Sequence, residues 1–271
     1  MAQVGVFDSG VGGLSVVREL LAQLPHVSLV YLADQAHAPY GQRSLDEIRQ
    51  LSDGITRFLL DQGARVIVIA CNTASAAALH WLRRQYPGVP FVGMEPAIKP
   101  AAERTRTRHV GVMATRATFQ GELFASLIDR FAADVTVHTQ VCAELVPLVE
   151  AGELDSERAR AAVAEYVAPL VAAGIDELVL GCTHYPFLRP LIEDSAGPGV
   201  EIIDPAPAVA RQVGRVLALQ GHGDEAEARG SRFYTTGDPA HFSGQLRSLI
   251  GLNHRARPAA WVSGRLGISQ I

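Results

Sequence analysis

The sequence predicts an α/β protein made of two similar doubly wound parallel-sheet domains, related by pseudo-two-fold symmetry, with a functional site in the cleft between them. Short runs of β-branched residues alternate with longer helical patterns, which is typical of a parallel sheet covered by helices. Three motifs recur in the same order in two halves of the chain. Polar clusters follow several expected strands, where open parallel sheets bind their ligands.

The expected strands are short and apolar, because strands buried on both faces of a sheet read as continuous hydrophobic runs. Most are separated by enough residues for a crossover helix. The expected strands are Val4–Phe7, Ser28–Leu32, Val66–Ala70, Phe91–Met94, Val110–Met113, Asp134–Thr139, Glu177–Leu180, Glu201–Ile203 and a final strand around Arg232–Tyr234.

Helical periodicity fills several of the intervals between these strands. The clearest helices are expected at Leu14–Gln23, Ser44–Gln62, Ala76–Arg84 and Ser156–Ala172. The segment Leu219–Ser231 is rich in Gly, Ala and charged residues, so we expect a surface loop there.

An internal repeat underlies the expectation of two similar domains. The matched segments are Gly5–Ser9 with Gly111–Thr115, Cys71–Thr73 with Cys182–His184, and Glu95–Ala97 with Asp204–Ala206. Their separations are 106, 111 and 109 residues, and three matches in register indicate a duplicated half.

The two acidic-Pro-Ala segments are the expected crossings between the domains, because proline stiffens the chain. We therefore expect a discontinuous first domain of residues 1–96 and 210–271. The second domain, residues 97–209, is then an insertion into the first.

Composition excludes several classes of function. The chain has 271 residues, a net charge of −4 and no basic cluster, so nucleic acid is not an expected partner. No apolar run is long enough to span a bilayer, and no membrane association is expected. The chain passes from Met1 almost directly into a strand pattern, so no secretory leader is expected. Three cysteines do not make a disulfide framework at this length, so a reducing, cytoplasmic location is expected.

A glycine-rich segment, Asp8-Ser9-Gly10-Val11-Gly12-Gly13, follows the first strand and opens a helix. Its glycines allow a tight turn and a close approach to the backbone. It is not G-x-G-x-x-G and no Walker lysine follows, so it does not predict phosphate binding; its free N–H groups suit a carboxylate equally well. Taken alone, an ordinary strand-to-helix turn with a side-chain cap is the favoured interpretation.

Two of the three cysteines occupy matched positions. Cys71 and Cys182 each follow a strand and precede polar residues at an expected helix start, where the helix dipole lowers the pKa of a thiol. Cys142 is interpreted as a small buried hydrophobic residue. No C-x-x-C or H-E-x-x-H motif is present, so no metal site is expected. A redox disulfide between the two matched thiols stays open, and a single-nucleophile hydrolase would leave one of them unexplained.

Two opposed thiols suit the transfer of a proton between the two faces of one carbon. If the similar halves face each other, Cys71 and Cys182 approach one cleft from opposite sides. The transfer needs a base on one face and an acid on the other, and the roles exchange when the reaction reverses. Two equivalent groups meet that need, one as thiolate and one as thiol. Asp8 near one thiol and His184 near the other would steer the protons.

Five stretches carry a specific resemblance: Gly5–Leu14, Pro39–Gly41, Cys71–Ser75, Glu95–Ala97 and Leu180–Pro186. In this order, they resemble the glutamate racemases, the cofactor-independent members of the aspartate/glutamate racemase group. The Gly-Cys-Thr-His-Tyr-Pro segment resembles glutamate rather than aspartate racemases.

The resemblance implies interconversion of L-glutamate and D-glutamate, which supplies D-glutamate for peptidoglycan. It implies that Cys71 takes the α-proton from D-glutamate and Cys182 from L-glutamate, assisted by Asp8 and His184 respectively. Glu150 matches a polar position that the family keeps near the second thiol. The implied substrate-binding residues are Asp8, Ser9, Tyr40, Gly41, Asn72, Thr73, Thr115, Thr118, Thr183 and His184.

No cofactor is expected. A racemase that uses pyridoxal phosphate needs a Schiff-base lysine, and Lys99, the one lysine in the sequence, lies between two prolines at an expected domain crossing. The carbanion-like transition state then depends on hydrogen bonds in a closed, desolvated cleft, so domain closure is expected. An aspartate racemase and a non-catalytic thiol-redox or regulatory protein on this fold stay open as alternatives. A homodimer, common in the family, is a further expectation.

Overall fold

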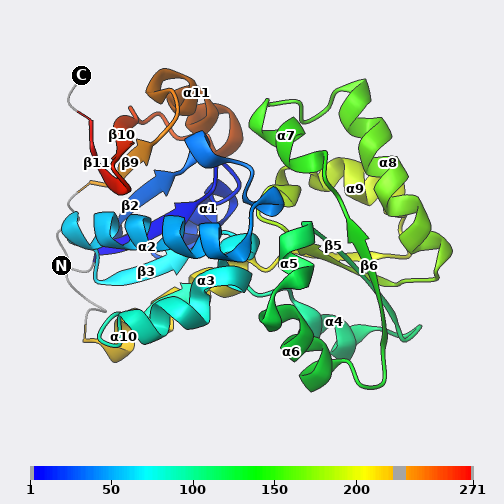
Figure 1. The fold of residues 1–271 in the computed structure, drawn as a ribbon. Helices are drawn as coiled ribbons and strands as arrows, with labels where there is room; N and C mark the ends of the chain where they lie inside the picture. The colour runs from blue at the N-terminus through cyan, green and yellow to red at the C-terminus, as the bar shows by residue number, and fades with distance from the viewer. Residues whose placement is uncertain (1–2, 222–229, 270–271) are drawn as a thin grey trace.

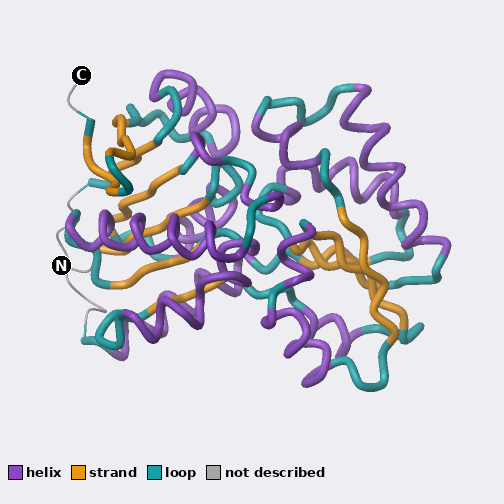
Figure 2. The backbone as a smooth tube through the Cα atoms, viewed as in Figure 1, coloured by secondary structure: helices purple, strands orange, loops and turns teal. Residues whose placement is uncertain are grey.

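Two mostly parallel sheets lie side by side in the computed structural model, and helices cover both faces of each sheet (Figures 1 and 2). The structure describes residues 3–221 and 230–269. Most of the loop expected at Leu219–Ser231 therefore lies outside the described residues. Within the described ranges, no helix has the length and apolar character needed to cross a membrane.

The first sheet has seven strands in the order β11-β10-β9-β2-β1-β3-β4. Its strands are β1 (Gln3–Asp8), β2 (Ser28–Ala33), β3 (Val66–Ile69), β4 (Phe91–Gly93), β9 (Arg232–Thr235), β10 (Arg257–Val262) and β11 (Arg265–Ile268). All neighbouring strands in it are parallel except β10 and β11, which form an antiparallel pair at the edge.

The second sheet has four parallel strands in the order β6-β5-β7-β8. Its strands are β5 (His109–Ala114), β6 (Thr136–Val141), β7 (Glu177–Gly181) and β8 (Glu201–Ile203). This order repeats the β2-β1-β3-β4 order of the first sheet, strand for strand. The two halves therefore share one topology, and the predicted fold of two similar doubly wound α/β units is confirmed.

Helices lie between most successive strands of the chain, as the crossovers of parallel sheets require. They are α1 (Leu14–Gln23), α2 (Leu45–Asp61), α3 (Asn72–Gln85), α4 (Ile98–Arg104), α5 (Arg116–Gln120), α6 (Glu122–Phe131), α7 (Leu145–Glu150), α8 (Glu157–Ala172), α9 (Arg189–Ala196), α10 (Ala206–Leu219) and α11 (Pro239–Ile250), with 3₁₀ turns η1 (Gln35–His37), η2 (Tyr40–Gln42) and η3 (Tyr185–Leu188). Ser44 begins α2 with a reciprocal capping box to Glu47, and Ser156 caps α8.

The domain boundaries stay a prediction. Strands from both ends of the chain share the first sheet, and strands from its middle form the second. The expected boundary at 209/210 falls inside α10, which packs against α1, β3 and β4 of the first unit. We propose a boundary just before Ala206, because a helix packed on one sheet moves with that sheet.

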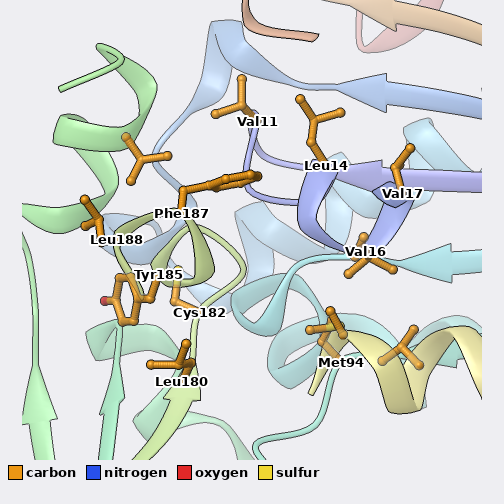
Figure 3. Close-up of a cluster of buried hydrophobic side chains, with 14 of the residues drawn as sticks. Val11, Leu14, Val16, Val17, Met94, Leu180, Cys182, Tyr185, Phe187 and Leu188 are labelled. Carbon is orange, nitrogen blue, oxygen red and sulfur yellow. The ribbon is translucent and has the colours of Figure 1, made fainter. Parts of the chain in front are cut away.

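The hydrophobic cores of the two units merge into one buried cluster. Val11, in the turn after β1, and Leu14, the first residue of α1, belong to the same buried cluster as Cys182 and Phe187, which follow β7 (Figure 3). Phe187 extends toward Val11 in this view. The ends of β1 and β7 are therefore held together by apolar packing as well as by polar contacts.

Asp176 anchors the turn that leads from α4 into β5. Its side chain is 5% exposed and accepts hydrogen bonds from the hydroxyls of Thr105 and Thr107 and from the N–H groups of Arg106 and Thr107. Burial alone raises the pKa of this carboxyl, but the hydrogen bonds outweigh burial and lower its pKa from 3.8 to about 2.

Replacement of Asp176 by alanine is expected to lower the free energy of unfolding at pH 7 by about 2 kcal/mol, since four donors lose a charged acceptor. The pKa is lower in the folded than in the unfolded chain, so this stabilisation is present above about pH 4 and is lost as pH falls toward 2. Urea unfolding of both proteins at several pH values measures it. An equal difference at pH 2 and pH 7 would contradict the assignment.

Candidate active site

The polar segments of the two units lie at equivalent places in equivalent sheets. In each sheet, the chain runs outward in opposite directions from a central pair, β1 with β3 and β5 with β7. Ligands of doubly wound sheets bind beyond the carboxyl ends of such a pair. Asp8 and Cys71 lie at that edge of the first sheet, and Thr115 and Cys182 lie at that edge of the second.

Hydrogen bonds join these two edges to each other. The Thr183 hydroxyl donates to Oδ2 of Asp8 over 3.1 Å, and the N–H of Val11 donates to Oε1 of Glu150 over 2.7 Å. Oγ1 of Thr73 lies 2.8 Å from Oγ1 of Thr115. The structure therefore brings residues from both halves into one buried polar site.

The glycine-rich turn after β1 makes this close approach possible. A Cβ on Gly10 would lie 1.8 Å from Oε1 of Glu150, and one on Gly12 would lie 2.2 Å from Nδ1 of His184. Side chains of the second unit occupy the space that any other residue would need here. The glycines thus allow the side chains of Glu150 and His184 to approach the backbone of the turn.

Cys71 is the N-cap residue of α3, as the sequence predicts, and it is 4% exposed. The N–H of Ala74 lies 3.4 Å from Sγ, and the N–H of Ser9 also points to the thiol. The expected lowering of its pKa is wrong. Burial and the neighbouring Asp8 carboxylate raise the pKa of the Cys71 thiol well above its usual value, and they outweigh both N–H groups.

Cys182 does not begin an α-helix, so that part of the prediction is wrong. It follows β7, and the chain forms the 3₁₀ turn η3 before α9 begins at Arg189. A side chain takes the place of the helix dipole: Nδ1 of His184 lies 3.7 Å from Sγ of Cys182, and both residues are buried. The positive charge next to the Cys182 thiol is therefore that of the His184 imidazolium.

His184 connects Cys182 to Glu150. Its Nε2 lies 2.7 Å from Oε1 of Glu150. Burial alone lowers the pKa of His184, but its contacts with Cys182 and Glu150 and the charge of Asp8 raise it well above the ordinary value. Burial likewise raises the pKa of Glu150 on its own, and the hydrogen bonds from His184, Val11 and Gln35 reverse this and lower it. The pair is thus held as imidazolium and carboxylate.

Asp8 lies on the other side of this cluster and is fully buried. Burial raises the pKa of its carboxyl, although the charge of His184 and the N–H of Gly10 act against burial. One ligand atom each from Asp8, Glu150 and His184 lies within 4.8 Å of the others, as in a metal site. Hydrogen bonds within the protein already engage these groups. The absence of a metal stays a prediction.

Asn72, the first residue of α3, carries an amide that no other group among the described residues engages. It is 2% exposed, and neither its Oδ1 nor its Nδ2 has a hydrogen-bond partner. An unsatisfied buried amide is costly, so a ligand that completes its hydrogen bonds is the expected explanation. Next to it, Thr73 meets Thr115 and Thr118 in a cluster of three buried hydroxyls.

Tyr40 and Gly41 approach the same cluster from the 3₁₀ turn η2. A Cβ on Gly41 would lie 2.9 Å from Cβ of Thr115, so this turn closes directly over Thr115. The Tyr40 hydroxyl donates to Oδ2 of Asp34 over 2.6 Å. Asp34, which sequence reasoning missed, also accepts from Trp261 and Thr236 and so fixes the loop that carries Tyr40.

A family model described as Asp/Glu/Hydantoin racemase matches residues 4–213. A curated relative from Herpetosiphon aurantiacus, named glutamate racemase, is 55% identical over 241 residues, which are 89% of this chain and 94% of that protein. The chain belongs to the Asp/Glu/Hydantoin racemase family.

Solved structures of racemases have the same fold. The Francisella tularensis glutamate racemase in complex with D-glutamate aligns with a TM-score of 0.84 at 28% identity, covering 96% of this chain and 97% of that one. The Escherichia coli glutamate racemase in complex with L-glutamate and the activator UDP-MurNAc-Ala aligns with a TM-score of 0.84 at 31% identity, covering 97% and 99%. The predicted class of enzyme, an amino-acid racemase, is confirmed.

Two further polar side chains contact this buried cluster and were not predicted. Nε2 of Gln35 donates to Oε2 of Glu150 over 3.2 Å, and Nε2 of Gln245 donates to the backbone oxygen of Glu150 over 2.8 Å. They lie 115 and 95 residues away from Glu150 in sequence. No short motif joins such distant positions, so only the fold reveals them.

Proposed function

We propose that this protein interconverts L-glutamate and D-glutamate without a cofactor, by moving the α-proton between Cys71 and Cys182. One observation carries the proposal: the two thiols follow equivalent strands of a repeated fold, and each has its own acid–base neighbour. Asp8 acts on Cys71, and the His184–Glu150 pair acts on Cys182. Two equivalent groups are what a reversible transfer between two faces needs.

In the direction from D-glutamate, the Cys71 thiolate takes the α-proton and becomes a thiol. The electron pair left on the α-carbon delocalises into the adjacent carboxylate, and the Cys182 thiol then donates its proton to the opposite face. Cys182 is left as a thiolate beside the His184 imidazolium. The reverse reaction exchanges the two roles, and proton exchange through Asp8 and His184 restores the starting state.

The raised pKa of Cys71 gives substrate binding a role in forming the base. A buried thiolate next to the Asp8 carboxylate costs free energy. The ammonium group of a bound amino acid brings a positive charge into the cluster and offsets that cost. Asp8, Ser9, Thr183 and His184 are the side chains we propose for the ammonium and α-carboxylate end.

The side-chain carboxylate of the substrate is proposed to bind at the cluster of buried hydroxyls. Asn72 and the residues Thr73, Thr115 and Thr118 offer neutral donors for a carboxylate, and Tyr40 and Gly41 close over them. Related racemases have been solved with D-glutamate and with L-glutamate. A dicarboxylate with the length of glutamate is therefore the proposed substrate.

Three finer expectations belong with this proposal. D-glutamate from the reaction would serve peptidoglycan synthesis in the cytoplasm, the protein would assemble as a homodimer, and no cofactor would be needed. Lys99 supports the last point, because its ammonium lies 3.8 Å from Glu103 and 5.7 Å from the ring centre of Phe131, and its side chain is 57% exposed. It belongs to α4 and forms no part of the buried cluster.

Turnover of the separate enantiomers tests the proposal. The purified protein without added cofactor is expected to racemise both D- and L-glutamate, and to act on aspartate at least 100-fold more slowly, on the order of discrimination that one methylene allows. Faster turnover of aspartate would establish the aspartate racemase instead. No turnover of either amino acid would favour the non-catalytic thiol-redox or regulatory protein.

Replacement of Asn72 by alanine is expected to raise KM for both enantiomers about tenfold, because a hydrogen bond to a charged ligand is lost. Thermal stability should be unchanged or higher, since the amide has no partner in the protein. Asn253→Ala, at an exposed position, is the matched control. A large loss of stability with an unchanged KM would show that Asn72 is structural.

A further inference from the structure

A directed chain of hydrogen bonds reaches Glu150 from the first unit. The N–H of Gly237 donates to Oγ1 of Thr235, so the Thr235 hydroxyl is free to donate, and it donates to Oε1 of Gln35 over 2.8 Å. Oε1 of Gln35 thereby faces Thr235, and Nε2 faces two acceptors: Oε2 of Glu150 and Oε1 of Gln245, 2.9 Å away. Every donor and acceptor of the Gln35 amide has a partner, which allows one orientation only.

Gln245 completes a ring around Glu150. Its Oε1 accepts from Gln35, and its Nε2 donates to the backbone oxygen of Glu150. Gln245 is 6% exposed on α11, and Thr235 is fully buried on β9, so both ends of the chain are fixed by packing. Gly237 leaves room for this arrangement, because a Cβ there would lie 3.0 Å from Cβ of Gln35.

Both carboxylate oxygens of Glu150 are consequently held. Oε1 accepts from Val11 and pairs with His184, while Oε2 accepts from Gln35. Without the Gln35 amide, the carboxylate can rotate about its terminal bond and weaken its contact with the imidazole. The charged or titratable groups that face His184 are Cys182, Glu150 and Asp8. The two carboxylates, Glu150 and Asp8, stabilise the buried imidazolium, so loss of the Glu150 contact removes one of them.

We propose that Gln35 and Gln245 are positioning residues for the racemase reaction: they hold the Glu150 carboxylate against His184 and thereby keep the imidazole aligned with Cys182. The proposal rests on the proposed function, since this alignment matters only if Cys182 carries a proton to and from the substrate. The donors belong to the first unit and Glu150 to the second, so the network is complete only while the two units are in contact.

Three variants test the proposal: Gln35→Leu, Gln245→Leu and Thr235→Val. For Gln35→Leu we expect kcat with either enantiomer to fall about tenfold, the effect of one hydrogen bond to a charged group, with KM changed less than about twofold. The basic limb of the pH profile of kcat/KM should move to lower pH by about one unit, because a more weakly paired imidazolium loses its proton sooner.

Thr235→Val keeps the side-chain shape and removes only the hydroxyl that orients the Gln35 amide. This variant therefore tests the positioning role of Gln35 even if a leucine variant folds poorly. It should move the basic limb in the same direction, with a fall in kcat of about two- to threefold. Gln50→Leu, at an exposed position on α2, is the matched control and should match the unmodified enzyme in kcat and in pH profile.

Two results would overturn the positioning role: kcat within about twofold of the unmodified enzyme in Gln35→Leu and Gln245→Leu, or a lower kcat with an unshifted basic limb, which marks general structural damage. Failure of the proposed function looks different, because the unmodified protein would then not racemise glutamate.

Discussion

Cys71→Ser and Cys182→Ser are each expected to lower the rate of glutamate racemisation by at least about a thousandfold in both directions. Serine fits the space of each thiol, but its hydroxyl is far harder to ionise, so a base is lost on one face and an acid on the other. Both directions fail together, because each thiol is the base in one direction and the acid in the reverse. A racemisation assay started from either enantiomer measures the loss.

Cys142→Ser is the control for these substitutions. Cys142 is fully buried behind the site, and its thiol donates to the backbone oxygen of Gln140, a contact that a serine hydroxyl can keep. We expect its racemase activity to stay within about twofold of the unmodified protein, with some loss of stability. Full activity in either Cys71→Ser or Cys182→Ser would rule out the two-thiol mechanism.

Gly12→Ala is expected to lower kcat about a hundredfold while the protein still folds. The added Cβ would lie 2.2 Å from Nδ1 of His184 and 2.5 Å from Oγ1 of Thr183. His184 must move to make room for this Cβ, and the imidazole then loses its contact with Cys182. General acid–base catalysis by Cys182 is therefore weakened on its face of the substrate. Crowding of the core should also lower the free energy of unfolding by about 1–3 kcal/mol.

Gly88→Ala separates this local effect from the general effect of a methyl group on the backbone. A Cβ on Gly88 meets no atom within 4 Å, so activity should be unchanged and stability equal or slightly higher. Steady-state kinetics and thermal unfolding of the two variants are compared with the unmodified protein. A Gly12→Ala enzyme with nearly full kcat would show that His184 is not held where catalysis needs it.

Much of the fold could be predicted because it depends on local patterns. The nine expected strands all correspond to observed strands, from β1 at Gln3–Asp8 to β9 at Arg232–Thr235, with ends that differ by a few residues. The β10–β11 hairpin was missed. Its second strand, Arg265–Ile268, is mostly exposed. It has no buried face that would require the alternation of apolar and polar residues that marks a strand. Pro258 also weakens the strand pattern of Arg257–Val262.

The composition of the site could be predicted, but its electrostatics could not. The strand-to-helix position of Cys71 follows from the sequence, whereas its raised pKa follows from burial between the two units. The same limit applies to Gln35 and Gln245, which meet Glu150 only because η1, α7 and α11 converge in the folded chain. Local patterns show which groups are available, and tertiary contacts decide how they act.

The distribution of deuterium early in the reaction tests the two-base mechanism most directly. Racemisation of L-glutamate in deuterated water, without cofactor, is followed by mass spectrometry of the separated enantiomers during the first few per cent of conversion. Two separate thiols predict that D-glutamate carries deuterium at its α-carbon while the remaining L-glutamate carries none, because the proton taken by one thiol is not the one delivered by the other. Deuterium in the remaining L-glutamate as early as in the product, or an α-proton retained in the product, would show that a single group serves both faces.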